Sequence, residues 1–486
     1  VTGSGKTTTC HRLLSEANMP FLVIEPAKTE YRTLINNDND IVVFTLGNEA
    51  VAPFRINPFE LIKGEVISAH VDMIKATFTS AFPMEASMPQ ILEEAIYKCY
   101  EKKGWDVNTN TNKSYGEDPY EPGKNSFPIL SDLLQEMEVV VKSKKFSAQM
   151  QADYIGSLVS RLSNLTVGSK GSMLNCERST DFRFIARNNI ILEMEELKSP
   201  EDKALFMGFV LSRLSAVIKD EHKENPEFRH LTLIEEAHRL LSKVEYGDSG
   251  SKKSAVETFS DLLAEVRKYG EGLIIVDQIP NKLVSEVLKN TNTKIIHKIL
   301  ARDDKEAVGD TMLMDDKQKE YLSALNVGNA IVFSEQTEKP VHVHITSVSD
   351  TTEKQIGNDV VKNRFLQCID KGYLGECYER AEIRAIYPLY NEVANMIRKL
   401  KMDVGKFSEI KEKIASAANS SNMEVPQVWE KLIIHRDMLS GKAGSSMFTQ
   451  EERVSVLKDF FVHTFYNNNF CDDDIYEKKE VTTYLM

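Results

Sequence analysis

The chain opens with a run of residues that strongly limits the folds open to it, Val1-Thr2-Gly3-Ser4-Gly5-Lys6-Thr7-Thr8. This run matches all but the first glycine of the phosphate-binding loop G-x-x-x-x-G-K-[ST], and that glycine would fall one place before Val1. We therefore expect that the sequence begins inside a motif. In an intact loop, the backbone N–H groups of the turn and of the following helix wrap the phosphates of a nucleotide.

Each position of this loop has an expected task. Gly3 and Gly5 let the chain turn with its amides on one concave side, where a Cβ would block the phosphate. Lys6 would reach the β and γ phosphates, and the Thr7 hydroxyl would hold Mg²⁺. The expected nucleotide-binding residues are Gly3, Ser4, Gly5, Lys6, Thr7 and Thr8. The alternative is a flexible Gly/Ser terminus, but a helix is predicted directly after the loop, from Thr8 to Ala17.

A second chemical centre follows an apolar stretch in Leu231-Thr232-Leu233-Ile234-Glu235-Glu236-Ala237-His238. A strand that ends in two acidic residues is what a phosphate-loop NTPase places beside its nucleotide. Glu235 would bind Mg²⁺ directly or through water, and Glu236 would polarise the water that attacks the γ phosphate. The alternative is an ordinary strand followed by the acidic start of a helix. We expect His238 to pack or form a hydrogen bond rather than take part in the chemistry.

Short apolar runs between helical stretches predict the fold class. Phe21–Ile24 and Ile41–Leu46 surround a helical stretch, which is the βαβ pattern of a doubly wound α/β protein with a mostly parallel sheet. Further strands are expected at Asn189–Met194, Leu231–Ile234 and Leu273–Gln278. The last three predicted strands, 295–299, 330–333 and 341–345, are expected to complete the same sheet.

At 486 residues, the chain exceeds what one core usually supports. We expect the first part of the core over 1–60, a helical insertion over 61–184, the second part of the core over 185–347 and a helical C-terminal region over 348–486. Within the insertion, Trp105–Phe127 is rich in Asn, Gly, Pro and Tyr, so an exposed loop is expected there.

Two more side chains are candidates for the reaction. Arg267 lies in the last turn of a predicted amphipathic helix, Ala255–Tyr269, where it could offset the helix dipole or reach the γ phosphate of a neighbouring subunit. Gln278 follows a predicted strand at the sheet edge where ligands of open α/β sheets bind, so it could sense the γ phosphate. Arg302 is a second arginine that could cross a subunit boundary.

Composition narrows the class of protein further. The net charge of −13 argues against a broadly basic surface, so any contact with nucleic acid must come from local patches. No run of about 18 apolar residues is present, so no membrane span is expected. The six cysteines are scattered and no secretory signal is seen, which favours reduced thiols and a cytoplasmic location.

With these residues in hand, the chain resembles the HerA/FtsK superfamily of ring-forming NTPases, and within it the HerA-like ATPases. The matching pieces lie in family order over residues 1 to about 345. They are Thr2–Thr7, Leu22–Tyr31, Leu46-Gly47 with Pro53–Phe59, Glu235–His238, Arg267–Gly270 and Asp277–Pro280.

The resemblance implies a RecA-like P-loop core, ATP and Mg²⁺ as cofactors, assembly as a homo-hexamer, and double-stranded DNA moved through a central pore. It implies Lys6, Thr7 and Glu236 as core catalytic positions, Gln278 as a sensor and Arg267 as a trans arginine. It also implies a partner nuclease or other effector, in DNA end processing or anti-phage defence.

The sequence departs from the family pattern in two ways. Glu235 stands where the family often has Asp, and the amino-terminal β-barrel of the family is absent from the sequence. Two alternatives stay open: a conjugation or secretion ATPase of the same superfamily, and a nucleotide-stabilised scaffold for an effector.

Overall fold

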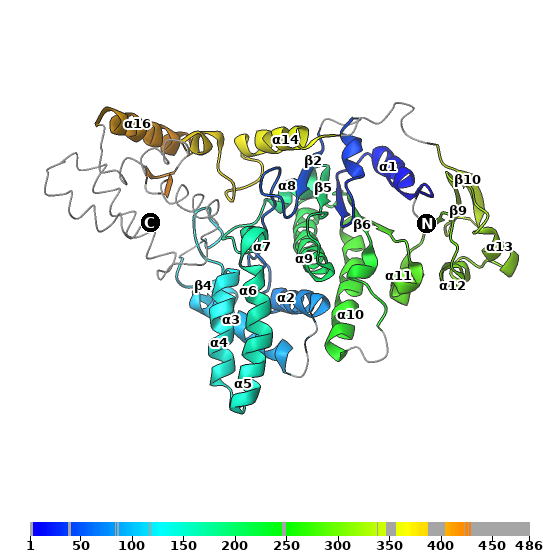
Figure 1. The fold of residues 1–486 in the computed structure, drawn as a ribbon, viewed down its shortest axis with the longest axis horizontal. Coiled ribbons are helices and arrows are strands. Elements are labelled where there is room, and N and C mark those ends of the chain that lie inside the picture. Colours follow the sequence, from blue (N-terminus) through cyan, green and yellow to red (C-terminus); the bar gives the residue numbers. More distant parts are fainter. Residues whose placement is uncertain are drawn as a thin grey trace. The chain divides into compact units, whose positions relative to one another are not determined.

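The computed structural model describes residues 3–36, 40–82, 84, 87–115, 118–244, 249–337, 339–346, 356–386, 404–421, 423–425, 427 and 428. The chain divides into two compact units, Val1–Phe365 and Leu366–Met486. Figure 1 shows that the strands and most of the described helices belong to the first unit.

The centre of the first unit is a sheet of five strands in the order β2-β5-β1-β6-β7. Its strands are β2 (Val42–Thr45), β5 (Ile190–Glu193), β1 (Phe21–Glu25), β6 (His230–Glu235) and β7 (Glu271–Val276). Every pairing within it is parallel. The expectation of an α/β fold with a mostly parallel sheet is therefore confirmed.

The register brings acidic residues together at one edge of this sheet. Glu25 at the end of β1 pairs with Glu193 at the end of β5, and Glu235 at the end of β6 pairs with Val276 on β7. Strands β1, β2 and β5 are buried along their whole lengths because a parallel sheet is covered on both faces. The carboxyl edge of the sheet therefore carries acidic side chains, and the strands that lead to it are buried.

Helix α1 (Lys6–Glu16) precedes β1, and a 3₁₀ helix, η1 (Tyr31–Asn36), follows it. The 25-residue helix α9 (Pro200–Glu224) joins β5 to β6 and begins with an N-cap hydrogen bond from the amide of Asp202 to Ser199. After β6 come η3 (Ala237–Arg239), α10 (Gly250–Glu265) and η4 (Val266–Tyr269), which leads into β7.

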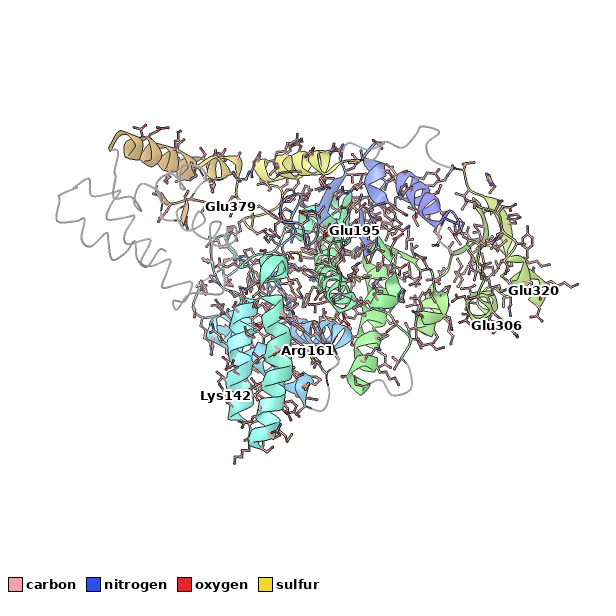
Figure 2. All side chains as sticks on the ribbon, viewed as in Figure 1. Lys142, Arg161, Glu195, Glu306, Glu320 and Glu379 are labelled. Carbon is pink, nitrogen blue, oxygen red and sulfur yellow. The ribbon has the colours of Figure 1, made fainter. Side chains whose placement is uncertain are left out.

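A largely helical segment lies in sequence between β2 and β5. It contains α2 (Ile67–Ala81), α3 (Met88–Lys102), α4 (Leu130–Ser143), α5 (Ala148–Tyr154), the π helix η2 (Ile155–Val159), α6 (Ser160–Leu165), α7 (Gly168–Leu174) and α8 (Phe182–Arg187). Figure 1 shows α4 beside α5 and α6, which follow one another along one line, and Figure 2 labels Lys142 and Arg161 on this group of helices.

The expectation of an exposed loop at Trp105–Phe127 is wrong for the two ends of that stretch. A short hairpin, β3 (Trp105–Asp106) with β4 (Thr111–Asn112), forms there. Trp105 and Phe127 are buried and stack on each other, and the Trp105 indole donates to the Ser126 carbonyl at 2.7 Å. The aromatic residues override the turn-forming composition because they bury a large apolar area.

The prediction that the last three strands complete the main sheet is also wrong. Strands β8 (Lys294–Ile296), β9 (Asn329–Phe333) and β10 (Val341–His344) form a separate antiparallel sheet in the order β10-β9-β8. The short connection from β9 to β10 permits only an antiparallel pair. Helices α12 (Arg302–Asp310) and α13 (Asp316–Tyr321) lie between β8 and β9 in sequence, and a small core with Met312 and Leu322 forms there.

In the second unit, the described helical residues include the end of α14 (Asn358–Asp370) and α16 (Val404–Ser420). Much of the predicted helical region over 348–486, including residues 387–403 and 429–486, lies outside the described residues. Across the described helices, none combines the length and the apolar character needed to cross a bilayer.

Candidate nucleotide site

The glycine-rich loop turns directly into α1. Gly3 and Gly5 adopt positive φ angles of 75° and 105°, and Gly5 is the N-cap of the helix. The first backbone N–H groups of any α-helix lack partners within the helix, so this turn presents amide donors and the positive end of the helix dipole. Such an arrangement is suited to binding phosphate.

Gly5 is also the point where the second sheet approaches the loop. A Cβ at Gly5 would lie 3.3 Å from the Gly328 nitrogen and 3.4 Å from the His297 ring. The Thr9 hydroxyl and His297 Nε2 are 2.8 Å apart, and the Gly328 amide donates to the Ser4 carbonyl over 3.4 Å. These contacts tie the end of β8 and the start of β9 to the loop. The sequence analysis had not identified His297.

Two residues that follow β1 form hydrogen bonds with the predicted magnesium ligands Thr7 and Glu235. The Thr7 hydroxyl donates to Glu30 Oε2 at 2.6 Å, and the Tyr31 hydroxyl donates to Glu235 Oε1 at 2.9 Å. Because Glu30 and Tyr31 are adjacent, Thr7 at the start of α1 and Glu235 at the end of β6 meet around one dipeptide. The structure thus brings the two predicted centres together.

The Glu25 carboxyl group, at the end of β1, binds the backbone of this dipeptide. It accepts the backbone N–H of Glu30 at 2.6 Å and that of Tyr31 at 3.4 Å. Burial, reinforced by the nearby Glu235 and Glu193 carboxylates, raises the pKa of Glu25 to about 9. Burial also raises the pKa of Glu235, against the opposing effect of the Tyr31 hydrogen bond. The edge therefore gathers carboxyl groups whose ionised forms a cation would stabilise.

Glu236 has an unusual backbone conformation for a residue with a side chain. Its φ of 51° and ψ of 41° lie in the left-handed region, which turns the chain sharply from β6 into η3. The Glu236 carboxylate lies 3.7 Å from His238 Nε2 and 3.9 Å from the Arg239 guanidinium. Strain of this kind gathers at functional sites, and here it sets the direction of the Glu236 side chain.

His238 forms hydrogen bonds, as expected. Its ring Nδ1 lies 2.8 Å from Asp277 Oδ2, and its backbone N–H donates to the same oxygen at 3.0 Å. Asp277 directly follows β7, so this pair connects the turns after β6 and β7. The link fixes the turn that carries Glu236.

The other predicted residues lie at different ends of β7. Gln278 is exposed at the carboxyl end of the strand and lines the same cavity as Lys6. Arg267 is exposed in η4, before the amino end of β7, so it is not on the edge that carries Glu235. Arg302 begins α12 and pairs with Glu306, which Figure 2 labels.

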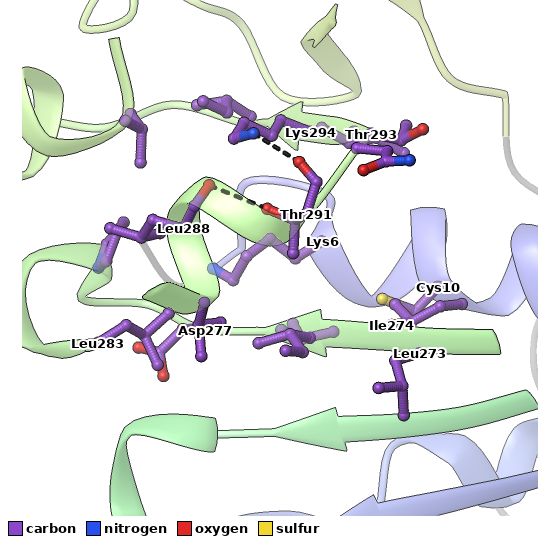
Figure 3. Close-up of a pocket in the computed structure, with 18 of the residues that line it drawn as sticks. Lys6, Cys10, Leu273, Ile274, Asp277, Leu283, Leu288, Thr291, Thr293 and Lys294 are labelled. Carbon is purple, nitrogen blue, oxygen red and sulfur yellow. Dashed lines mark hydrogen bonds between the residues drawn. The ribbon is translucent and has the colours of Figure 1, made fainter. Parts of the chain in front are cut away.

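A cavity of about 560 Å³ extends from Lys6 along β7 (Figure 3). One wall is β7, including Leu273 and Ile274, and the other includes residues of β8. Both strands are at the ends of their sheets, so each offers an unpaired edge to this space. Lys6, Asp277 and Gln278 line this cavity at the carboxyl edge of the sheet.

The residues present fit a magnesium ion that arrives with a nucleotide. Within the described residues, no group of three or more His, Cys, Asp or Glu side chains could hold a metal. Mg²⁺, however, is commonly held by one or two carboxylates together with substrate phosphates. The Ser4 hydroxyl in the loop is buried and has no hydrogen-bond partner among the parts of the chain that the structure describes. This unsatisfied group suits a site completed by a ligand.

The chain is similar in sequence to proteins named as DNA repair helicases. The chain is 27% identical over 357 residues to the DNA double-strand break repair helicase HerA of Sulfurisphaera tokodaii, covering 71% of this chain and 63% of that protein. It is 24% identical over 383 residues to the probable DNA double-strand break repair helicase HerA of Methanocaldococcus jannaschii, covering 71% of this chain and 70% of that protein. No protein-family model matches. The expected resemblance to HerA-like ATPases is confirmed.

Solved structures share the fold at lower identity. VirB4 of Thermoanaerobacter pseudethanolicus matches with a TM-score of 0.55 and 18% identity, over 73% of this chain and 89% of that one. The plasmid coupling protein TrwB, in complex with the GTP analogue GDPNP, matches with a TM-score of 0.50 and 11% identity, over 73% of this chain and 86% of that one. The fold is that of a RecA-like P-loop NTPase.

Proposed function

We propose that this chain is a magnesium-dependent ATPase that acts as a motor on double-stranded DNA. The observation that carries the proposal is the meeting of Thr7 and Glu235 around the Glu30-Tyr31 dipeptide. The HerA relatives, which are named as DNA repair helicases, support DNA as the substrate of the motor. The solved structures support the nucleotide-binding fold.

The roles of the loop residues follow from their chemistry. The amides of residues 3–8 cradle the phosphates, and Lys6 neutralises charge on the β and γ phosphates. Thr7 and Glu235 would hold Mg²⁺, which would supply positive charge beside the phosphates. Glu236 orients and polarises the attacking water, while Asp277 and His238 fix its turn. Gln278 senses the γ phosphate from the end of β7.

Arg267 requires a second subunit in this proposal. It lines the same cavity as Lys6, but it lies before the amino end of β7, whereas Glu235 and Gln278 belong to the carboxyl edge. In a homo-hexameric ring, Arg267 would reach the γ phosphate bound by the neighbouring subunit. The net charge of −13 confines DNA contacts to local basic patches.

The motor is proposed to work with a nuclease or another effector protein, in DNA end processing or anti-phage defence. The chain matches 63% of the length of the Sulfurisphaera relative, so that protein's full activity is carried over only as a proposal. The likeness to VirB4 is a likeness of fold and does not by itself favour transport at a membrane.

The proposal is tested by ATP turnover with and without linear duplex DNA. The wild-type protein should hydrolyse ATP only with Mg²⁺ and faster with DNA. Lys6→Ala should abolish both rates. Lys298→Ala, which alters another lysine that lines the cavity, is the matched control and should leave turnover without DNA intact. Equal turnover by wild type and Lys6→Ala would rule out this site, and absence of DNA stimulation would rule out the DNA motor.

A further inference from the structure

We propose that Glu30 is a positioning residue for magnesium. Its carboxylate accepts a hydrogen bond from the Thr7 hydroxyl and so leaves the lone pairs of the hydroxyl oxygen free to ligate the ion. The inference rests on the proposed function and adds a residue to the same site. It assigns to Glu30 the task that an acidic residue at the end of β6 would otherwise perform.

The first support is the geometry at Thr7. Its hydroxyl donates to Glu30 Oε2 at 2.6 Å, the short distance typical of a hydroxyl bound to a charged carboxylate. A hydroxyl has one proton and two lone pairs. Once the proton points to Glu30, both lone pairs are available to a cation on the side of the phosphates. Partners of this kind, which orient a ligand from behind, tune metal affinity.

The second support is how Glu30 is held. Its other carboxylate oxygen, Oε1, accepts a hydrogen bond from the Lys28 ammonium, and its backbone N–H donates to Glu25 Oε1 at 2.6 Å. These contacts hold the Glu30 carboxylate in place as an acceptor.

The third support is the hydrogen bond that Glu235 accepts from Tyr31. Glu235 Oε1 accepts the Tyr31 hydroxyl at 2.9 Å, so this oxygen is engaged on the side of η1. Glutamate is one methylene longer than aspartate, and Tyr31 restrains the extra length. We infer a division of tasks in which Glu235 faces the ion or its water while Glu30 orients Thr7.

Lys28 reduces the negative charge that Glu30 would otherwise place near the nucleotide phosphates. An unpaired carboxylate near Thr7 would repel the nucleotide phosphates, and the Lys28 ammonium partly cancels its charge. Lys28 is about two-fifths exposed, at 43%, so its contribution is modest and depends on salt. Glu30 can therefore act as an acceptor without adding a full negative charge beside the phosphates.

The test measures Mn²⁺ and ADP binding separately in the full-length protein. Mn²⁺ affinity in saturating ADP is followed by electron paramagnetic resonance, and ADP affinity without metal is followed by calorimetry. Glu30→Ala should weaken Mn²⁺ binding by about 10- to 100-fold while ADP affinity without metal changes less than about twofold. Glu30→Gln retains an oxygen acceptor without charge and should show a smaller loss. If Glu30→Ala does not fold, Glu30→Gln decides the question.

Glu16→Gln is the matched control, because Glu16 is an exposed glutamate at the far end of α1 that pairs with Arg12. It should bind Mn²⁺ like the wild type. Unchanged Mn²⁺ affinity in both Glu30 variants would overturn the inference, and so would equal loss of ADP binding with and without metal. If the wild type itself binds neither ADP nor ATP, the proposed function fails; if only the Glu30 effect is missing, this inference alone fails.

Discussion

The Tyr31 hydroxyl donates a hydrogen bond to Glu235 Oε1 across 2.9 Å, which joins the first turn of η1 to the end of β6. Tyr31 is fully buried, so the position of its hydroxyl is fixed by packing. The contact places the acidic residue of β6 next to the segment that also holds Thr7. Several consequences of this arrangement can be measured.

Removing the Tyr31 hydroxyl should weaken magnesium use. In Tyr31→Phe, the Glu235 carboxylate loses a donor that lowers its pKa, and its side chain is no longer restrained. We expect the Mg²⁺ concentration for half-maximal ATP turnover to rise about tenfold or more. Tyr321→Phe, at a tyrosine that is 47% exposed, is the control. An unchanged Mg²⁺ requirement in Tyr31→Phe would show that this hydrogen bond has no part in metal binding.

Adding a Cβ at Gly5 should destabilise the protein even without nucleotide. The residue has a φ of 105°, and the new atom would lie 3.3 Å from the Gly328 nitrogen. We expect Gly5→Ala to lower the free energy of unfolding by about 1–3 kcal/mol, measured by urea denaturation. Gly250→Ala, which meets nothing within 4 Å, should change it by less than about 1 kcal/mol. Equal stability of the two variants would contradict the close approach at Gly5.

The buried Glu25 should make the nucleotide-free protein less stable at alkaline pH. The folded-state pKa is raised from 4.5 to about 9, so the folded state retains a proton that the unfolded state loses. This contribution to stability is complete below about pH 4.5, falls as pH rises, and is lost above about pH 9. Unfolding experiments without metal should show the decline in wild type and a flatter profile in Glu25→Gln. Parallel profiles would argue against a protonated Glu25.

Arg267 should act across a subunit boundary. Arg267→Ala should lower the turnover number by about 10³-fold with little change in ATP affinity. When Arg267→Ala subunits are mixed with Lys6→Ala subunits, part of the turnover should return. In a mixed ring, an Arg267→Ala subunit keeps its own Lys6, and its Lys6→Ala neighbour supplies the arginine. Lys268→Ala, at the adjacent exposed lysine, should keep turnover near wild type. If mixing restores nothing in rings that contain both variants, Arg267 is not a trans residue.

Much of the fold follows from local patterns. The buried runs at β1, β2 and β5 are apolar along their length, and their parallel pairing follows from the helices between them. The separate sheet of β8, β9 and β10 could not be recognised in this way, since an apolar strand does not reveal which sheet it joins. The buried ends of the Trp105–Phe127 stretch were hidden because its composition resembles a loop.

The site was only partly accessible to sequence reasoning. Lys6, Thr7, Glu235 and Glu236 belong to motifs whose chemistry is evident from the residue types. Glu30 and Tyr31 matched the family pattern, but no spacing indicates that they contact Thr7 and Glu235, which are distant in sequence. Contacts of this kind depend on the sheet order, which places β1 beside β6.

The most direct test of the account is ATP binding and turnover by Glu236→Gln. Glutamine keeps the size of the side chain but cannot polarise the attacking water as a carboxylate does. We expect ATP affinity close to that of wild type and a loss of turnover of at least about 10²-fold, measured under single-turnover conditions with Mg²⁺ and duplex DNA. Turnover equal to that of wild type would contradict the assignment of this edge of the sheet as the hydrolytic centre.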